Sequence, residues 1–359
     1  MYLLKVCAAH HPEVGRRFDR DEALRLIDEA AAGAGIEPEL VLHVISCEAT
    51  LLGHPVTAAV ANAVMAHWPE AVHQVVSLGC LGLYAAVRQV RAQQPRAALV
   101  FVYEVPGDLV QHRLDGLGLG VGADPRGMVA EEGIACIPLQ REDVATAGPG
   151  DLRLLECEIV AKRPTISGTR QMLQDLDQRL RPLLPTLDHW IMFDVRAHWS
   201  NFLVRWFNAR FCDELARVNV LPSSEPGREH RLSYKPALEL ATHRGQVEPQ
   251  QRLGVSSVGV GGRFGWMVFS ATALAPSAPA AVPTGEGRRG RAARWQPRGS
   301  ATGHETLGAT AGDGLLCAEP RHMGQRNAYF VWPLAPRRRG EPVAGHHPAI
   351  VLPGRFVAS

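Results

Sequence analysis

Apolar runs typical of buried strands alternate with amphipathic stretches through the first half of the chain. Four such runs cover residues 2–9, 40–46, 71–78 and 97–104. Apolar positions recurring at helical spacing predict helices between them, over residues 21–33, 57–68 and 83–90. Further strands are expected over residues 132–139 and 152–161. The order β-α-β-α-β-α-β predicts a layered α/β fold with helices packed on a sheet.

The second half follows the same plan more loosely. Helices are predicted over residues 168–184, 201–215 and 234–243, and strands over residues 189–194, 253–260 and 266–273. Glycines indicate a turn over residues 261–265. We therefore expect two similar α/β halves, residues 1–150 and 151–272, although their sequences do not match as a repeat.

The character of the chain changes at residues 273–359. Ten of the 26 prolines lie there, and the apolar periodicity is lost, so we predict a disordered tail or a stretch translated out of its ancestral frame. The tail carries eleven arginines and five acidic residues, so its net charge is +6, whereas the net charge of the whole chain is +2. Its arginines could instead form an arm for nucleic acid or an acidic partner. The first 272 residues carry the remaining −4, so their charge gives no reason to expect nucleic acid.

The distribution of cysteines and the first residues of the chain indicate the cellular compartment of the protein. Seven cysteines are scattered singly, with no CxxC pair and no spacing typical of metal ligands. An odd, dispersed set suits a reducing compartment, and we expect a cytoplasmic protein without a bound metal. The first residues lack the apolar core of a secretory signal, and no window has eighteen uncharged apolar residues, so no membrane partner is expected.

One cysteine stands where a nucleophile could be presented. The apolar run at 71–78 ends at Gly79, Cys80 follows, and a helical pattern begins after Gly82. A thiol at a helix N-terminus faces unpaired backbone N–H groups and the helix dipole, both of which favour the thiolate. The two glycines would let a bound group approach the backbone. The alternative interpretation is a buried core cysteine acting as a small hydrophobe.

Five further stretches of residues 1–272 serve as landmarks beside the Gly79-Cys80-Leu81-Gly82 turn. In order along the chain they are Gly35-Ile36-Glu37-Pro38-Glu39, His54-Pro55-Val56-Thr57-Ala58, Glu131-Glu132-Gly133-Ile134-Ala135-Cys136-Ile137, Leu187-Asp188-His189-Trp190-Ile191 and Val258-Gly259-Val260-Gly261-Gly262-Arg263-Phe264-Gly265-Trp266. Their order and spacing resemble the thiolase-like condensing enzymes, in particular the ketoacyl-acyl-carrier-protein synthase III type, and Gly79-Cys80-Leu81-Gly82 falls where that family has its nucleophile turn. The resemblance implies a thiolase-like α-β-α-β-α fold.

The resemblance also implies acyl transfer. Cys80 would attack an acyl thioester of coenzyme A or of an acyl carrier protein, which are substrates rather than bound cofactors. The oxyanion and acyl site would be formed by the Cys80 backbone and by the closing loop with Gly262, Phe264 and Gly265. The family generally dimerises, so a homodimer or a heterodimer with a related subunit is expected.

The sequence departs from the family at the partners of the cysteine. No histidine stands at the expected position after the strand at 187–192, but His198 and Asn201 have His-x-x-Asn spacing about five residues later. Asn201 could equally cap the following helix. No asparagine precedes the helix at 234, where His230 could act as base or imidazolium donor, or could be a solvated loop histidine.

Two classes of function follow from these residues. The first is a cysteine-dependent acyltransferase or divergent ketosynthase III-like enzyme, in fatty-acid-like or specialised polyketide biosynthesis. The alternative is a catalytically degenerate subunit of the same fold that serves as a scaffold for an active homologue. Retention of Cys80 favours the enzyme, and the missing asparagine favours the scaffold.

Overall fold

The computed structural model describes most of the first 272 residues and, beyond them, residues 331–333. Within the first 272 residues it leaves out 6–7, 11–16, 46–54, 105–106, 117–119, 121, 123–128, 146, 149, 163–165, 193–199, 222–228, 231 and 260–262. The chain divides into two compact units, Met1–Ala275 with Tyr329–Ser359, and Pro276–Ala328. The second unit lies outside the described residues, so the fold below is that of the first.

The first half alternates strands and helices as the apolar pattern predicts. Its strands are β1 (Tyr2–Leu4), β2 (Ala8–His10), β3 (Leu40–Val44), β4 (Val72–Val76), β5 (Ala97–Glu104), β6 (Val129–Ala130) and β7 (Gly133–Arg141). Its helices are α1 (Arg20–Ala34), α3 (Pro55–His67), α4 (Gly82–Gln93) and α5 (Gly107–Gly116). Helix α1 begins where the Asp19 carboxylate accepts from the Glu22 N–H, and it ends at Gly35, whose φ of 62° suits a residue without Cβ.

The second half begins with a strand at Leu152. Its strands are β8 (Leu152–Ala161), β9 (His189–Ile191), β10 (Asn219–Leu221), β11 (Glu229–His230), β12 (Arg252–Gly259) and β13 (Arg263–Ala271). Its helices are α6 (Ile166–Leu183), α7 (Ser200–Arg210), α8 (Cys212–Leu215) and α9 (Lys235–His243). Most of these elements agree with the prediction to within two or three residues at each end.

The two halves share one sheet topology. The strand order is β10-β9-β12-β13-β8-β1-β7-β5-β3-β4-β14, where β14 is the short strand Val331–Pro333. If β1, β3, β4, β5 and β7 are numbered 1 to 5, and β8, β9, β10, β12 and β13 likewise, each half has the order 3-2-4-5-1. In both halves strands 2, 3 and 4 pair in parallel, and strand 5 pairs antiparallel with strands 4 and 1. The duplication of architecture expected from the sequence is therefore present.

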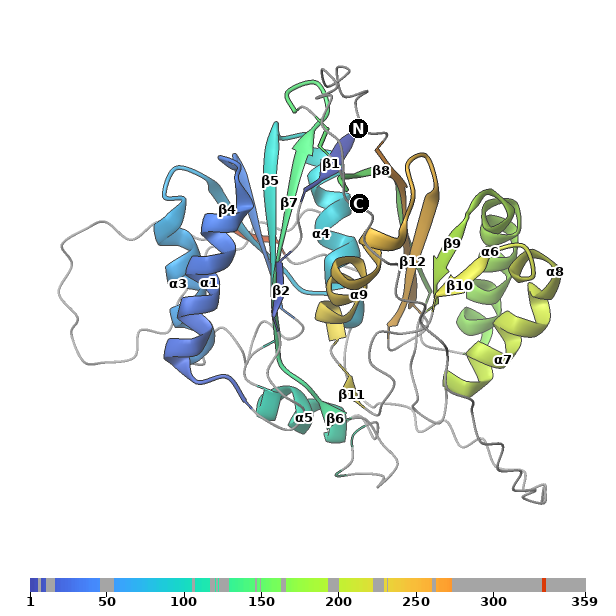
Figure 1. Cartoon of the computed structure of the whole chain (residues 1–359). Helices are drawn as coiled ribbons and strands as arrows, with labels where there is room; N and C mark the ends of the chain where they lie inside the picture. The colour runs from blue at the N-terminus through green and yellow to red at the C-terminus, as the bar shows by residue number, and fades with distance from the viewer. Residues whose placement is uncertain are drawn as a thin grey trace, which may run out of the picture. The chain divides into compact units, whose positions relative to one another are not determined.

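Helices form three layers around these strands (Figure 1). Helices α1 and α3 lie side by side against the first half, and α6, α7 and α8 lie against the second. Helices α4 and α9 lie centrally, and their apolar residues belong to the core cluster on the opposite face of the sheet. Apolar side chains thus fill both faces of the central strands, as their continuous apolar runs require.

Several features differ from the sequence-based prediction, among them the unpredicted two-residue strands β6 and β11. Strand β10 was not expected, because three residues with two exposed side chains carry too little apolar pattern. The single helix predicted over residues 201–215 is two helices that meet at Phe211, whose ring packs edge-on against Trp206. The turn predicted over residues 261–265 is wrong for Arg263–Gly265, which begin strand β13.

One short part of the segment 273–359 is described. Strand β14 (Val331–Pro333) pairs antiparallel with β4, at the edge of the sheet. The rest of that segment, including its arginine-rich stretch, lies outside the described residues, so the predicted disorder stays a prediction.

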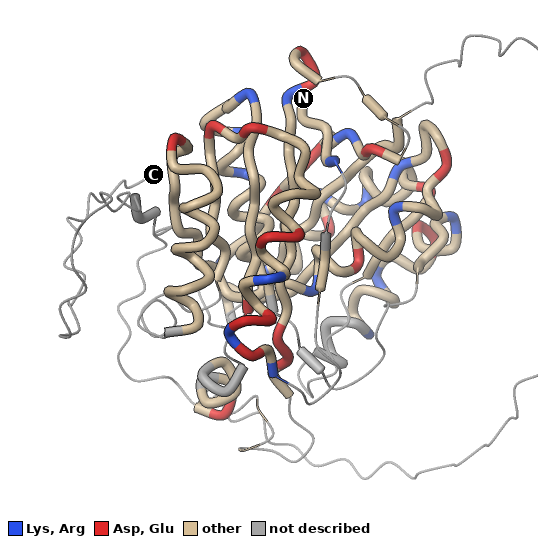
Figure 2. Tube along the Cα trace, turned by 60° about the vertical axis from the view of Figure 1, so that its left-hand side comes forward, with Lys and Arg blue, Asp and Glu red and all other residues tan. Residues whose placement is uncertain are grey.

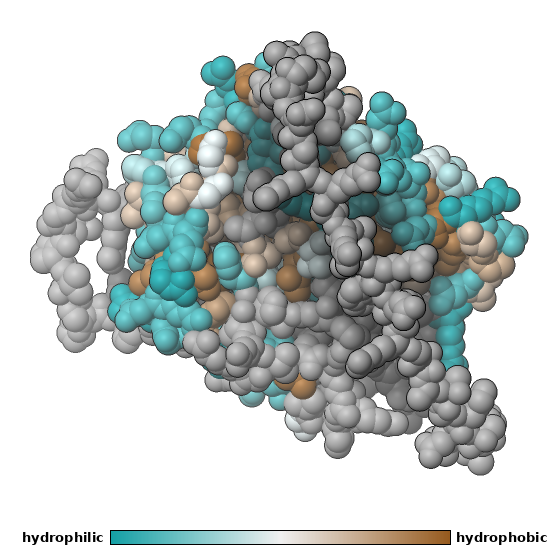
Figure 3. All heavy atoms as spheres, in the orientation of Figure 1, coloured by the Kyte–Doolittle hydropathy of each residue, from teal (hydrophilic) through white to brown (hydrophobic). Residues whose placement is uncertain are grey.

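Charge is spread over the described surface rather than gathered by sign. Figure 2 shows acidic and basic residues interspersed along the described trace. Figure 3 shows that hydrophilic residues predominate at the periphery of the face it presents. None of the helices formed by described residues is long and apolar enough to cross a membrane.

Candidate functional site

Cys80 lies in a tight turn between a buried strand and a central helix, as the sequence predicts. Strand β4 ends at Val76, and the 3-10 turn η1 (Gly79–Leu81) follows and leads directly into α4 at Gly82. Gly79 has a φ of 53°, which favours glycine at the entry to the turn. The Cys80 side chain is 4% exposed. The thiol is therefore held at the start of a helix and away from bulk solvent.

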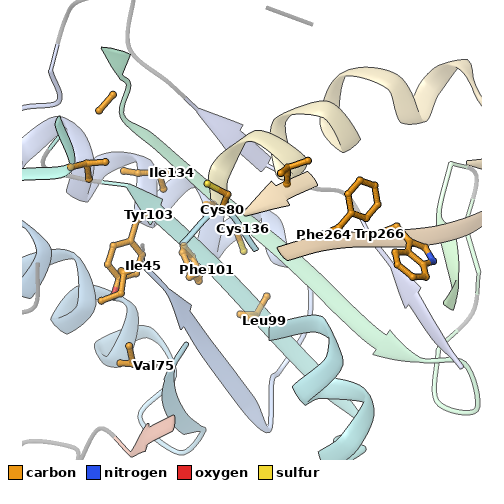
Figure 4. Close-up of a cluster of buried hydrophobic side chains, with 14 of the residues drawn as sticks. Ile45, Val75, Cys80, Leu99, Phe101, Tyr103, Ile134, Cys136, Phe264 and Trp266 are labelled. Carbon is orange, nitrogen blue, oxygen red and sulfur yellow. The ribbon is translucent and has the colours of Figure 1, made fainter. Parts of the chain in front are cut away.

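Apolar side chains from three strands lie near Cys80. Figure 4 shows Cys80 beside Cys136 and Phe101, which come from β7 and β5, with Phe264 from β13 nearby. All four belong to one core cluster, to which both halves contribute. Cys80 thus lies where the two halves meet.

Helix α9 of the second half is preceded by a turn of the same kind. The 3-10 turn η3 (Leu232–Tyr234) leads directly into α9, as η1 leads into α4, and the two turns pack against each other. Cys80 and Ser233 are the middle residues of their turns, and both side chains are buried. Ser233 is therefore the counterpart of Cys80 in the second half.

Strand 4 of each half anchors the turn of the other half. The Ser257 hydroxyl on β12 donates to the carbonyl of Cys80 at 3.4 Å. The Glu104 carboxylate at the end of β5 accepts from the backbone N–H of Ser233 at 3.2 Å and also from the Ser233 hydroxyl. Both turns are thus fixed by hydrogen bonds that cross the junction of the halves.

Glycines on strand 5 make room for the residue that follows the middle of each turn. A Cβ added at Gly133 on β7 would lie 2.4 Å from the ring of Tyr234, and one at Gly265 on β13 would lie 3.0 Å from Leu81. The sheet register pairs each glycine with an anchoring residue, Gly133 with Glu104 and Gly265 with Ser257. The two turns, and the strand residues that contact them, are therefore equivalent position by position.

Phe264 and Gly265 were predicted to lie in a glycine loop, and this prediction is wrong. Both residues lie in β13, which pairs with β12 on one side and β8 on the other. Phe264 faces the cluster that contains Cys80, whereas the place of a Gly265 side chain is taken by Leu81 and Tyr84. Gly265 is needed for close packing of α4 on the strand, a role that a glycine motif alone does not distinguish from a loop.

The other predicted site residues fall partly or wholly outside the described residues. His198 and Gly262 are not described. The backbone of Asn201 lies in the first turn of α7, which begins one residue earlier, and the backbone of His230 lies in β11, which pairs with β6. The side chains of Asn201 and His230 are not described, so the roles of these residues stay predictions.

Sequence reasoning missed Glu104 and Ser233. A signal for Glu104 was available, because a carboxylate directly after seven apolar residues of a buried strand calls for a specific partner. Ser233 offered no comparable signal, because a lone serine before a helix is ordinarily a cap. Only the meeting of the two halves brings Glu104 to Ser233 and the turn of Ser233 against the turn of Cys80.

A second buried polar cluster lies on the face of the first half covered by α1 and α3. His43 on β3 is within hydrogen-bond distance of Tyr103 Oη at 3.2 Å and of His73 Nδ1 at 3.0 Å. His73 Nε2 in turn lies 2.8 Å from the carbonyl oxygen of Trp68. Burial, and then the neighbouring His73, lower the pKa of His43 to about 3. Both imidazoles are therefore neutral near pH 7.

The part of the chain that the structure describes contains no group of three or more His, Cys, Asp or Glu side chains placed to hold a metal ion.

Solved structures of known proteins share this fold. No protein-family model matches the sequence, and no curated protein matches it. ChlB3, described as an acyltransferase, superposes with a TM-score of 0.54 at 16% identity, over 77% of this chain and 99% of its own. AbyA1, a tetronic acid condensing enzyme, gives 0.52 at 14% identity, over 76% and 100%. OleA of Xanthomonas campestris with cerulenin gives 0.50 at 14% identity, over 72% and 81%.

The likeness to thiolase-like condensing enzymes that the landmarks indicated is thus confirmed at the level of the fold. The chain has the thiolase-like α/β fold, with two similar halves.

Proposed function

We propose that this protein is a cysteine-dependent acyltransferase or divergent ketosynthase III-like enzyme. The observation that carries the proposal is the position of Cys80, in a tight turn before a central helix where two duplicated halves meet. The fold is shared with ChlB3, described as an acyltransferase, and with AbyA1, described as a condensing enzyme, which supports the same class of reaction.

The proposed reaction begins with thioester exchange at Cys80. The thiolate attacks the acyl carbonyl, the carbon–sulfur bond to the donor breaks, and the donor thiol leaves with a proton. The backbone N–H groups of Cys80 and Gly262 would stabilise the oxyanion. The imidazole of His198, which is paired with Asn201 in the sequence motif, or the imidazole of His230 would take and return protons.

Donor and acceptor follow from the same proposal. The donor is an acyl thioester of coenzyme A or of an acyl carrier protein, and the acyl group then passes to a second substrate in fatty-acid-like or polyketide biosynthesis. Replacement of the expected asparagine weakens a decarboxylative condensation more than a simple transfer to an amine or hydroxyl. We further propose that the protein works in the cytoplasm, as a homodimer or paired with a related subunit.

Burial of Cys80 favours a second candidate function. Cys80 is 4% exposed and belongs to a core cluster of hydrophobic residues, an environment that also suits an inert structural cysteine. In that case the chain would be a catalytically degenerate subunit that supplies interface to an active homologue.

Acyl loading separates the two functions. The full-length protein is incubated with acyl-CoA esters of increasing chain length, and with the same acyl groups on a carrier protein, and its intact mass is measured. We expect an acyl adduct on the wild type that the Cys80→Ala variant loses. The matched control is Cys212→Ala, because Cys212 is free and exposed and its removal should leave the adduct unchanged.

Two results would contradict the enzyme. An adduct that persists in Cys80→Ala would place the acyl group elsewhere. The absence of an adduct with every thioester would leave the scaffold function.

A further inference from the structure

We propose that Glu104 and Ser233 are positioning residues for Cys80, so that a carboxylate and a hydroxyl on the opposite side of the junction set the reactivity of the thiol. This inference rests on the proposed function of Cys80 as nucleophile. It adds two residues that neither the resemblance nor the motif spacing singles out.

The first support is the equivalence of the two turns. Cys80 and Ser233 are the middle residues of η1 and η3, and each turn precedes a central helix. Strand 4 of the opposite half bonds to each turn, through Ser257 for Cys80 and through Glu104 for Ser233. One turn of the pair carries the thiol, and the other carries a hydroxyl hydrogen-bonded to a carboxylate.

The second support is the strength of the Glu104 anchor. The Glu104 side chain is fully buried, and one of its oxygens accepts both the backbone N–H and the hydroxyl of Ser233. The one Glu104 oxygen thus holds both the backbone and the side chain of Ser233. The turn of Cys80 has by comparison a single long hydrogen bond from this direction, from the Ser257 hydroxyl to the Cys80 carbonyl at 3.4 Å. The position of η3 is therefore fixed more firmly than that of η1.

The third support is direct contact between η3 and the start of α4. A Cβ added at Gly82 would lie 3.2 Å from Ser233 Cβ and 3.5 Å from its hydroxyl oxygen. Gly82 is the first residue of α4 and lies two residues after Cys80. Val44 of β3, at 2.6 Å from the added Cβ, and Ser233, held by Glu104, thus form the surface on which the first turn of α4 rests. A shift of η3 would move one side of that surface, and with it the backbone that presents the thiol.

The test measures the reactivity of Cys80 itself. The full-length wild type and its variants are treated with iodoacetamide across a range of pH, and alkylation of Cys80 and Cys212 is followed by mass spectrometry of their peptides. Cys212 is exposed and serves as the internal reference. The matched control is Ser256→Ala, which removes another buried hydroxyl, one that donates to the carbonyl of Ile191 at 3.2 Å on β9.

Ser233→Ala and Glu104→Ala are expected to slow alkylation of Cys80 by about tenfold or more, because small misplacements of a reacting group carry such penalties. Alkylation of Cys212 should not change, and Ser256→Ala should alkylate Cys80 at the wild-type rate. The double variant should be no slower than the slower single variant, because both residues act through one contact.

Wild-type reactivity of Cys80 in folded Ser233→Ala, or additive losses in the double variant, would overturn the inference. If Ser233→Ala does not fold, Glu104→Leu decides, because it fills a similar volume and removes both acceptor oxygens. Slower alkylation of Cys80 in Glu104→Leu supports the inference, and an unchanged rate overturns it. A wild-type Cys80 that neither alkylates nor takes an acyl group refutes the proposed function. Acyl loading that is equally fast in all variants refutes the inference alone.

Discussion

The Gly133→Ala variant is expected to lose about 3 kcal/mol or more of its free energy of unfolding, at or above the usual cost of overpacking a core. The added Cβ would lie 2.4 Å from two carbons of the Tyr234 ring, which is fully buried and cannot move aside. Relief would require η3 to shift away from β7, and with it Ser233. Urea denaturation of the variant and of the wild type measures the loss.

Gly33→Ala is the matched control for this experiment. A Cβ at Gly33 meets nothing within 4 Å, and Gly33 lies inside helix α1, so the same substitution is expected to raise stability by about 0.5–1 kcal/mol. The loss in the double variant Gly133→Ala/Tyr234→Ala should be smaller than the sum of the losses in the two single variants, since the clashing ring is gone. Equal stability of the two alanine variants would show that the packing of Tyr234 on Gly133 is not rigid.

Acidification is expected to destabilise the protein through the His43 cluster. Its hydrogen bonds run in one direction: the Trp68 carbonyl can only accept, so His73 Nε2 donates to it and His73 Nδ1 accepts from His43 Nε2. His43 Nδ1 is left to accept from the Tyr103 hydroxyl. A proton added to His73 would place two N–H groups against each other.

The sign of the effect follows from the lowered pKa of His43. Unfolded, the imidazole takes a proton below about pH 6.5, whereas in the folded protein it does so only near pH 3. The unfolded state therefore binds more protons between these values, and stability falls as the pH falls through this window. One such group costs about 1.4 kcal/mol for each pH unit below 6.5, so about 2–3 kcal/mol is lost between pH 8 and pH 4.5. Burial lowers the pKa of His73 as well, and its contribution has the same sign.

Denaturation curves at several pH values check this prediction. In His43→Gln the decline of stability between pH 6.5 and 4.5 should flatten, because the group with the most strongly lowered pKa is gone. His67 lies in the same layer, is exposed and contacts Asp28 at 2.8 Å, so His67→Gln should keep the wild-type dependence. An unchanged decline in His43→Gln would assign the acid sensitivity to other groups.

Much of the fold could be read from local pattern. Strands β5 and β8 begin and end where the apolar runs do, and α1 is bounded by Asp19 and Gly35, because burial on both faces and helix caps leave direct marks in the sequence. Strand β10 and the break at Phe211 left no such mark. Both depend on neighbours distant in the sequence, the first on pairing with β9 and the second on aromatic packing.

The candidate site was predictable only in part. Cys80 stood out because strand, glycine and helix follow one another along the chain within a dozen residues. Glu104 and Ser233 are 129 residues apart, and no spacing in the sequence connects them. Gly265 shows the opposite case, a residue whose motif was visible but whose role in seating Leu81 and Tyr84 was not.

Local sequence pattern was sufficient to place most strands and helices, to indicate that the halves follow one plan, and to put a single cysteine at the entry to a helix. These properties depend on residues close together along the chain, through apolar periodicity, caps and glycines. That the two turns meet, that each is anchored by the opposite half, and that the thiol is enclosed became visible only in the folded chain. Those facts depend on how two halves of equal topology join into one sheet through β1 and β8, and such a contact between distant residues leaves no local pattern in the sequence.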